Sequence, residues 1–409
     1  MTDVFTTADR AAADGRLGFV LRLGRALHEA GYATHRLEEA LESISRRLDL
    51  EGQFFATPTS IFASFGSDHR QRTFMMRTEP RPPDLGALVR VTEVAQAVSS
   101  GRETPSRGSE AIAALDGAGG STPAAVVVGY TLASGTAARF LGGGWPEMRI
   151  AAIAGLLTGT LAVLTTRYPR LGRVYEPVAA FACAALVSLL GVALGGFAVP
   201  VATLAGLIVL IPGLTVTTAI TELATQHLTA GTTRMAGAFM TFIGIGFGVA
   251  LGYRVAGLVG QPATVTPVPP PEWTFWAALV GAAMAFALLL RAERRDLLWI
   301  VASGLAAVVA AKAGTASLGA DLGVFVGAVA VTAFAWLYGR ITHRPGPVVL
   351  VPGLLVLVPG SIGFRGVLAL LDRQVLSGID AGFSMMLTAV ALVAGLLSAA
   401  AVLPEQPLD

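Results

Sequence analysis

The sequence predicts a polytopic α-helical membrane protein with about ten transmembrane helices, preceded by a soluble N-terminal α/β domain. Hydrophobic residues make up 54% of the chain and charged residues only 14%. The mean hydropathy of +0.66 is higher than a soluble domain can carry without large exposed apolar patches. After Pro123, apolar runs of about 20 residues follow one another, and this is the length that a helix needs to cross the hydrocarbon core.

The N-terminal part has periodic rather than continuous hydrophobicity, which is typical of a soluble domain. A first amphipathic helix is expected near 17–31, with Gly31 as the glycine that follows its last turn. A second amphipathic helix is expected over 37–48. Asp84 is the expected N-cap of a third helix, which extends to Val98.

A short antiparallel sheet is expected between the second and third helices. Residues 53–65 and 72–78 alternate or are β-branched and aromatic, and 66–71 have the composition of a turn. The Gly-rich stretch 116–123 marks the boundary with the membrane part. The first residues lack the pattern of a signal peptide, so we expect the soluble domain to be cytoplasmic.

Ten apolar spans are expected from residue 124 onward, and they lack the alternation of barrel strands, so they are helices. The expected spans are 124–141, 148–166, 178–197, 198–221, 234–259, 273–290, 297–314, 321–339, 347–371 and 381–403. They divide the chain into a soluble domain and two five-helix repeats, with the boundaries 1–120, 121–260 and 261–409.

The orientation of the spans follows from the basic residues beside them. With the N terminus inside, the cytoplasmic loops carry nine basic residues and the outer connections carry six. The positive-inside rule therefore places both termini in the cytoplasm of a cell whose inner (plasma) membrane holds the protein.

Two spans contain similar interrupted runs. The fourth contains IVLIPGL and the ninth contains VVLVPGL, so Pro212-Gly213 and Pro352-Gly353 are expected to break their helices at matching depth. Because the two spans are five apart, the halves are expected to be inverted repeats with a central solute site. The alternative is a pair of simple kinks in packed helices.

Polar residues near these breaks are the candidates for substrate binding or coupling. Thr217 and Thr221 either offer hydroxyls to a small solute or bond the carbonyl four residues earlier. Glu222, at a span end, is either a snorkelling interfacial group or a proton or substrate site. Arg365 either clamps a carboxylate or lies at the outer interface.

Motifs of several other functional classes are absent from the sequence. Lys312 is the only lysine and lacks the preceding glycine of a P-loop. The five histidines form no HExxH pair and no cluster with metal-ligand spacing, and Gly-x-Ser-x-Gly does not occur. We therefore expect no enzyme, no metal and no cofactor. The N-terminal arginines alternate with acids, which argues against nucleic-acid binding.

Several segments together resemble the threonine/serine exporter family of bacteria. They are GYATHRLEEALESISRRLDL, TPTSIFASF and DLGALVRV in the soluble part, and ITEL, GTTRM and the two Pro-Gly runs in the membrane part. The resemblance spans nearly the whole chain, and it implies export of L-threonine and L-serine driven by the proton motive force. It also implies a role for the matching residues, which are Pro212, Gly213, Glu222, Gly231, Arg234, Pro352 and Gly353.

Three hypotheses follow. The leading one is a proton-coupled exporter whose partners are threonine, serine, protons and the lipid bilayer, with a homo-oligomer left open and with the soluble domain regulating or gating the pore. In it, helix N-termini or Arg365 meet the substrate carboxylate, and Glu222 meets the ammonium or relays the proton. The second is an exporter or gated channel for another small polar metabolite.

The third hypothesis makes the soluble domain a membrane-tethered enzyme. Its support is a set of polar residues that a solvated surface explains better. These residues are His35, Glu38, Glu39, Thr57, Thr59 and Asp68.

Overall fold

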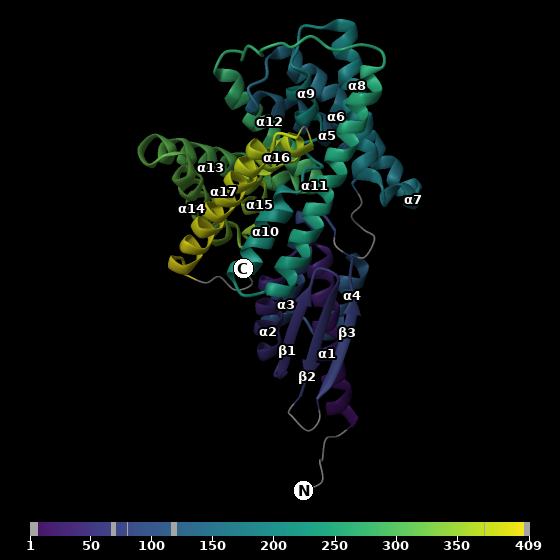
Figure 1. Cartoon of the computed structure of the whole chain (residues 1–409). Helices are drawn as coiled ribbons and strands as arrows, with labels where there is room; N and C mark the ends of the chain where they lie inside the picture. The colour runs from purple at the N-terminus through teal and green to yellow at the C-terminus, as the bar shows by residue number, and fades with distance from the viewer. Residues whose placement is uncertain (1–6, 67–70, 80, 116–120, 372, 405–409) are drawn as a thin grey trace.

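The computed structural model of the protein describes residues 7–66, 71–79, 81–115, 121–371 and 373–404. An N-terminal α/β unit packs against one end of a larger helical part (Figure 1). The expected helices near 17–31 and 37–48 and the expected sheet are present in the N-terminal unit.

The N-terminal unit contains one antiparallel sheet with the strand order β1-β2-β3 and four helices. Its elements are α1 Thr7–Glu29, α2 Thr34–Arg47, β1 Gly52–Thr57, β2 Ser60–Phe65, β3 Arg72–Arg77, α3 Leu85–Ser99 and α4 Pro105–Leu115. The sheet register pairs Phe55 with Phe62 and Phe62 with Met75. Phe54 and Ile61 point to the opposite face and are buried against the helices, so one face of the sheet carries the core.

Two local signals are confirmed. Gly31 has φ +84°, the left-handed conformation that ends a helix, and a side chain there would meet Pro83. Asp84 caps α3, because its carboxylate accepts a hydrogen bond of 2.8 Å from the backbone N–H of Ala87. The predicted turn falls largely on residues 67–70, outside the described residues, as does Asp68.

The helical part consists of long apolar helices and several short ones. Its elements are α5 Pro123–Phe140, α6 Trp145–Arg167, α7 Pro169–Gly172, α8 Tyr175–Leu194, α9 Val199–Gly206, α10 Gly213–Ala224, α11 Leu228–Gly257, α12 Trp273–Leu289, η1 Arg294–Asp296, α13 Leu297–Leu318, α14 Ala320–Thr342, α15 Pro347–Leu355, α16 Gly360–Leu371 and α17 Val375–Val402. Within the described residues, seven segments are long and apolar enough to cross a membrane: α6, α8, α11, α13 with η1, α14, α15 with α16, and α17.

The expected count of ten spans adds α5, α12 and the interrupted pair of α9 and α10 to these seven. α12 is a shorter apolar helix of 17 residues. The count of ten stays a prediction.

Two of the expected spans are interrupted, as predicted, but one interruption lies elsewhere. In the first half, α9 ends at Gly206 and α10 begins at Gly213, directly after Pro212. In the second half, the break was expected at Pro352-Gly353, and this is wrong. Pro352 lies inside α15, and the helix continues to Leu355.

The second half breaks at residues 356–359, and α16 begins at Gly360, directly after Pro359. The equivalent motifs are therefore GLIVLIPG, residues 206–213, and GLLVLVPG, residues 353–360. Proline is pre-set for the start of a helix, so the Pro-Gly that ends each motif restarts the chain as a helix. The second half contains VPG twice, and the local pattern alone matched the wrong copy.

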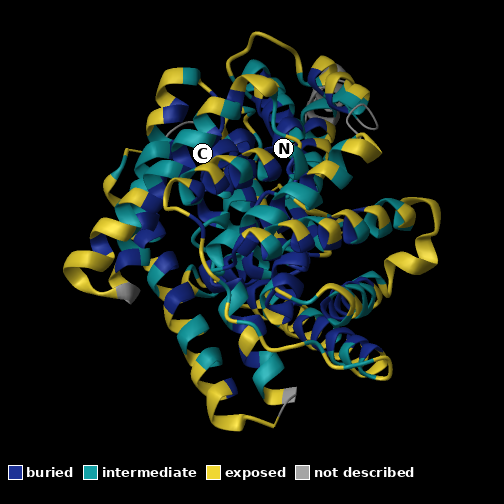
Figure 2. Ribbon diagram, turned by 90° about the horizontal axis from the view of Figure 1, so that it is seen from above, coloured by how far each residue is buried: buried dark blue, intermediate teal, exposed yellow. Residues whose placement is uncertain are grey.

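Buried residues of the helical part gather where the helices meet, and exposed residues lie on their outward faces (Figure 2). Large apolar side chains such as Phe239, Phe247 and Phe383 are exposed on these faces. A soluble protein rarely exposes so much apolar surface, whereas a lipid bilayer covers it.

Candidate functional site

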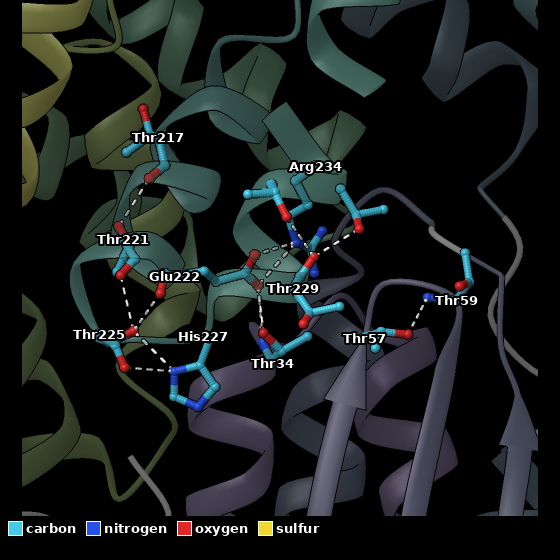
Figure 3. A network of polar contacts seen from close by, with 12 residues as sticks. Thr34, Thr57, Thr59, Thr217, Thr221, Glu222, Thr225, His227, Thr229 and Arg234 are labelled. Atoms are coloured by element: carbon cyan, nitrogen blue, oxygen red, sulfur yellow. Dashed lines mark hydrogen bonds and ion pairs between the residues drawn. The ribbon is translucent and has the colours of Figure 1, made fainter. Parts of the chain in front are cut away.

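Glu222 is the central residue of a polar cluster between the helical part and the N-terminal unit (Figure 3). Both of its carboxylate oxygens accept hydrogen bonds of 3.0 Å from the Nε of Arg234 on α11. The hydroxyl of Thr34, the first residue of α2, donates to the same carboxylate at 2.6 Å. Glu222 has no exposed surface, so a buried ion pair of the helical part is hydrogen-bonded directly to the N-terminal unit through Thr34.

A second pair lies beside the first. The Nε2 of His227 is 3.2 Å from a carboxylate oxygen of Glu38 on α2, and the His227 Nδ1 is 2.9 Å from the carbonyl oxygen of Thr225. The carbonyl oxygen only accepts, so the His227 ring donates to it through Nδ1. Burial raises the pKa of Glu38, opposed by the hydrogen bond of 2.6 Å from the backbone N–H of Ala56 and by the nearby His227.

His35 adds a third titratable group to the cluster. Its ring centroid is 5.9 Å from that of His227. Burial, followed by the nearby positive charges of Arg36, His227 and Arg234, lowers the pKa of His35 to about 4. The ring is therefore neutral at physiological pH, and enclosure keeps it neutral at mildly acidic pH, between about 4 and 6.5.

The N-terminal unit makes a second set of contacts, with the second half of the helical part. Arg291, after α12, donates to the carboxylate of Asp84 at 2.9 Å. The backbone N–H of Leu85 donates to the carbonyl oxygen of Leu290 at 2.8 Å, so the start of α3 is bound to the end of α12. Arg344 of the second half is buried in an ion pair with Asp296, and it also contacts Glu93 of the N-terminal unit. The N-terminal unit therefore contacts both halves of the helical part.

The two candidate threonines do not point free hydroxyls at a solute. Thr217 donates to the carbonyl oxygen of Gly213 at 3.1 Å, and Thr221 donates to that of Thr217 at 2.9 Å. Both are buried. Of the two interpretations offered for these threonines, the structure therefore shows the second, in which each hydroxyl donates to the carbonyl oxygen four residues earlier.

The two helix breaks meet at the centre of the molecule. A side chain added at Gly213 would meet Val358 and the Cα of Gly360, and one added at Gly360 would meet Ile211 and the Cα of Gly213. The N-termini of α10 and α16 therefore touch each other, and only glycine allows this approach. Pro212 is the N-cap residue of α10.

The remaining sequence candidates lie apart from the polar cluster. Gly353 packs against Ser303 and Val331. Arg365 is exposed on α16. Its proposed role as a carboxylate clamp stays a prediction. No group of three metal-ligating side chains occurs within the part of the chain that the structure describes.

Thr34 was not singled out by sequence reasoning, since one threonine at a helix start carries no signal for a distant partner. His35 and Glu38 were singled out, but as residues of an enzyme in the soluble domain. They instead face the turn between α10 and α11. Thr57 donates to its neighbour Ser60 within the turn between β1 and β2.

Two models of known protein families together match almost all of the helices and strands described above. A family model described as a putative threonine/serine exporter matches residues 18–256, which include the N-terminal unit and the helices up to α11. A second model, described as a threonine/serine exporter, matches residues 274–402, from α12 to α17. The chain belongs to the threonine/serine exporter family. The family descriptions name exporters and the apolar helices suit a membrane protein, so the comparisons point to membrane transport.

Curated relatives of this family member come from yeasts. An uncharacterized protein of Schizosaccharomyces pombe is 29% identical over 308 residues, which are 70% of this chain and 39% of that protein. The pheromone-regulated membrane protein 10 of Kluyveromyces lactis is 32% identical over 260 residues, 61% of this chain and 27% of that protein.

The protein of the same name from Saccharomyces cerevisiae is 28% identical over 256 residues, 60% of this chain and 33% of that protein. The exporter-family chain therefore covers less than half of the length of each of these relatives. No solved structure matches it.

Proposed function

We propose that the protein is a secondary transporter that exports L-threonine and L-serine from the cytoplasm and is driven by the proton motive force. The observation that carries this proposal is the meeting of two interrupted helices in a chain of the threonine/serine exporter family. Transporters bind solutes near the membrane midplane at the interface of inverted repeats, where discontinuous helices begin.

The two halves support an assignment as repeats. α10 and α16 each have 12 residues and begin 147 residues apart, and α11 and α17 also begin 147 residues apart. The turn before each of the latter two helices contains a residue with positive φ, Gln226 at +66° and Arg373 at +62°. A side chain at Gly231 would meet Leu223 and the carbonyl oxygen of Ala219.

The same contacts recur in the second half, where a side chain at Gly378 would meet Leu370 and the carbonyl oxygen of Gly366. Each of these three residues lies 147 positions after its first-half counterpart. Equal backbone breaks and equal packing partners point to one structural unit used twice.

The opposite orientation of the halves is supported by their contacts. The turn between α10 and α11 lies against the N-terminal unit, through Glu222 and His227. Figure 1 shows α10 on the side of the N-terminal unit and α16 on the far side of the centre. Five spans per half give this inversion. The proposed division is therefore a cytoplasmic domain, residues 1–120, and two repeats, residues 121–260 and 261–409.

In this proposal the N-terminal unit is a cytoplasmic gate. It contacts the first half through Thr34 and the second half through Asp84, so the halves cannot move relative to each other while both contacts hold. Alternating access requires such movement. A proton that reached Glu222 would weaken its bonds to Arg234 and Thr34 together, and this gives proton entry a route to releasing the gate.

The test is efflux of labelled threonine from proteoliposomes that contain the full chain, with and without an imposed proton gradient. Threonine efflux that depends on the gradient, and that serine but not alanine inhibits, is the expected result. No threonine efflux from folded protein under any gradient would overturn the exporter assignment and favour another small polar metabolite. Unchanged gradient dependence in Glu222→Gln would remove Glu222 from the coupling role.

A further inference from the structure

A cleft of about 350 Å³ lies in the second half of the helical part, between α12 and α13. Its walls include Phe275 of α12, Val308 and Thr315 of α13, and Leu357. Leu357 belongs to the segment that connects α15 to α16, so the cleft reaches the helix break of the second half. A small amino acid needs only a fraction of such a volume, and pockets for small ligands start at about this size.

The first half is closed at the equivalent place. A side chain at Gly155 on α6 would meet the hydroxyl of Ser134 and the carbonyl oxygen of Tyr130, because α5 packs directly on α6. On α13 of the second half, Gly304 is also buried, but a side chain added there would have nothing within 4 Å. The halves thus share one architecture but differ in one seam, which is shut in the first half and open in the second.

The open seam holds the only lysine of the chain. The ammonium of Lys312 lies 4.0 Å from the ring centroid of Phe275 and 5.0 Å from that of Trp276. Aromatic faces hold a cation in place without neutralising its charge.

The charges around Lys312 favour an anion that also carries an ammonium group. The guanidinium of Arg139 lies 5.9 Å from the centroid of Phe275, which places a second cation beside the same ring. The carboxylate of Glu272 is 4.0 Å from the Lys312 ammonium and is largely exposed. Two cations and one carboxylate at the mouth of an apolar cleft complement a zwitterion whose carboxylate enters first.

The cleft opens away from the N-terminal unit. Lys312 lies 16 residues after Asp296 on a continuous helix, which is about 24 Å at the rise of an α-helix. Asp296 pairs with Arg344, and Arg344 contacts Glu93 of the N-terminal unit. With the N-terminal unit in the cytoplasm, the lysine faces the outer side of the membrane.

We infer that this cleft is the outward-facing binding site for the α-carboxylate of the exported amino acid, and that Lys312 is the residue that binds this carboxylate. The inference rests on the proposed function and specifies where its substrate binds. Phe275, Trp276 and Glu272 are the groups that meet the substrate ammonium, and Leu357 connects the site to the helix break.

The experiment measures uptake of labelled L-threonine by proteoliposomes that contain the full chain, for the wild type, Lys312→Met and Lys312→Arg. We expect Lys312→Met to raise the KM for threonine about tenfold, because one charge-assisted hydrogen bond is lost. Lys312→Arg keeps the positive charge, so its KM for threonine should lie between those of the wild type and Lys312→Met. Arg340→Met is the matched control, since its guanidinium lies over the ring of Trp336 outside the cleft, and its KM should be unchanged.

A second measurement does not depend on the lysine. Ala311→Cys places a thiol in the cleft, and the native Cys183 is buried. A membrane-impermeant maleimide should label this thiol from the side opposite the N-terminal unit, and threonine should slow the labelling.

The outcomes separate the two proposals. If wild-type protein does not move threonine at all, the exporter assignment fails and this site fails with it. If the wild type moves threonine while Lys312→Met has the same KM, only the site is overturned. Labelling of Ala311→Cys that threonine leaves unchanged would also overturn the site alone.

Discussion

The hairpin of α10 and α11 and the hairpin of α16 and α17 have similar lengths and a residue with positive φ at the same place in the turn, but different polar residues. Glu222 and Arg234 form a buried ion pair in the first hairpin. The residues 147 positions later, Ala369 and Ala381, are alanines. The backbone of the unit therefore does not need the ion pair. The pair serves the one hairpin that contacts the N-terminal unit.

The largest expected loss of stability comes from removing the Glu222 carboxylate, which only the first hairpin has. Glu222→Ala leaves the Arg234 guanidinium largely buried without its partner, so we expect a loss of about 3 kcal/mol in the free energy of unfolding. The double variant Glu222→Ala, Arg234→Ala copies the second half and should recover most of this loss. Thermal unfolding in detergent measures both. A single variant as stable as the wild type would contradict the assignment of a structural ion pair.

A second prediction sharpens the comparison of the two seams. Gly155→Ala should cost about 2 kcal/mol, because the new methyl group meets Ser134 and the backbone of Tyr130. Gly304→Ala, on α13 of the second half, should be neutral or stabilising by up to about 1 kcal/mol, since an added methyl group has nothing within 4 Å and alanine favours a helix. Thermal unfolding of the two variants side by side checks this, and equal losses would show that the seams do not differ.

A third prediction concerns the pH dependence of stability, which His35 should affect through its contact with the first hairpin. The pKa of His35 falls from 6.5 to about 4 in the enclosed cluster. Above pH 6.5 His35 is mostly neutral in both the enclosed and the opened state, so the shift has little effect; as the pH falls from 6.5 towards 4, the opened state binds the proton more readily and the enclosed state loses stability. The raised pKa of Glu38 acts in the opposite direction and reduces the net effect.

The measurement is the thermal midpoint between pH about 7 and pH about 5 for the wild type and for His35→Gln. Arg36, His227 and Arg234 are the charged groups near the His35 ring, and they remain in the variant, as does Glu38, which contacts His227. The wild type should lose stability on acidification more steeply than His35→Gln. Parallel curves for the two proteins would exclude His35 as the group that titrates.

The smallest expected effect is at the contact with the second half. Arg291→Ala removes the pairing with Asp84, but the arginine side chain is 45% exposed, so solvent screens the pair. The loss should stay below about 1 kcal/mol, and it should shrink further at high salt. Thermal unfolding at low and high salt measures it. A loss as large as that of Glu222→Ala would show that both halves hold the N-terminal unit equally.

Sequence reasoning located the apolar helices, the caps and the first interruption, because each of these depends on neighbouring residues. Asp84 caps its own helix, Gly31 ends its own helix, and a proline changes its own turn. It misplaced the second interruption because VPG occurs twice in one apolar segment. Only the packing of Gly360 against Gly213 shows which copy is equivalent to Pro212-Gly213.

The sequence by itself determined that this chain is a helical membrane protein with a separate N-terminal domain, since hydropathy and periodicity are properties of contiguous residues. The tertiary structure alone decided the partners of the polar residues. Thr34 and Glu222 are 188 positions apart, and no local pattern joins them. A buried charge requires a partner wherever the fold can bring one, and that partner becomes visible only when the chain is folded.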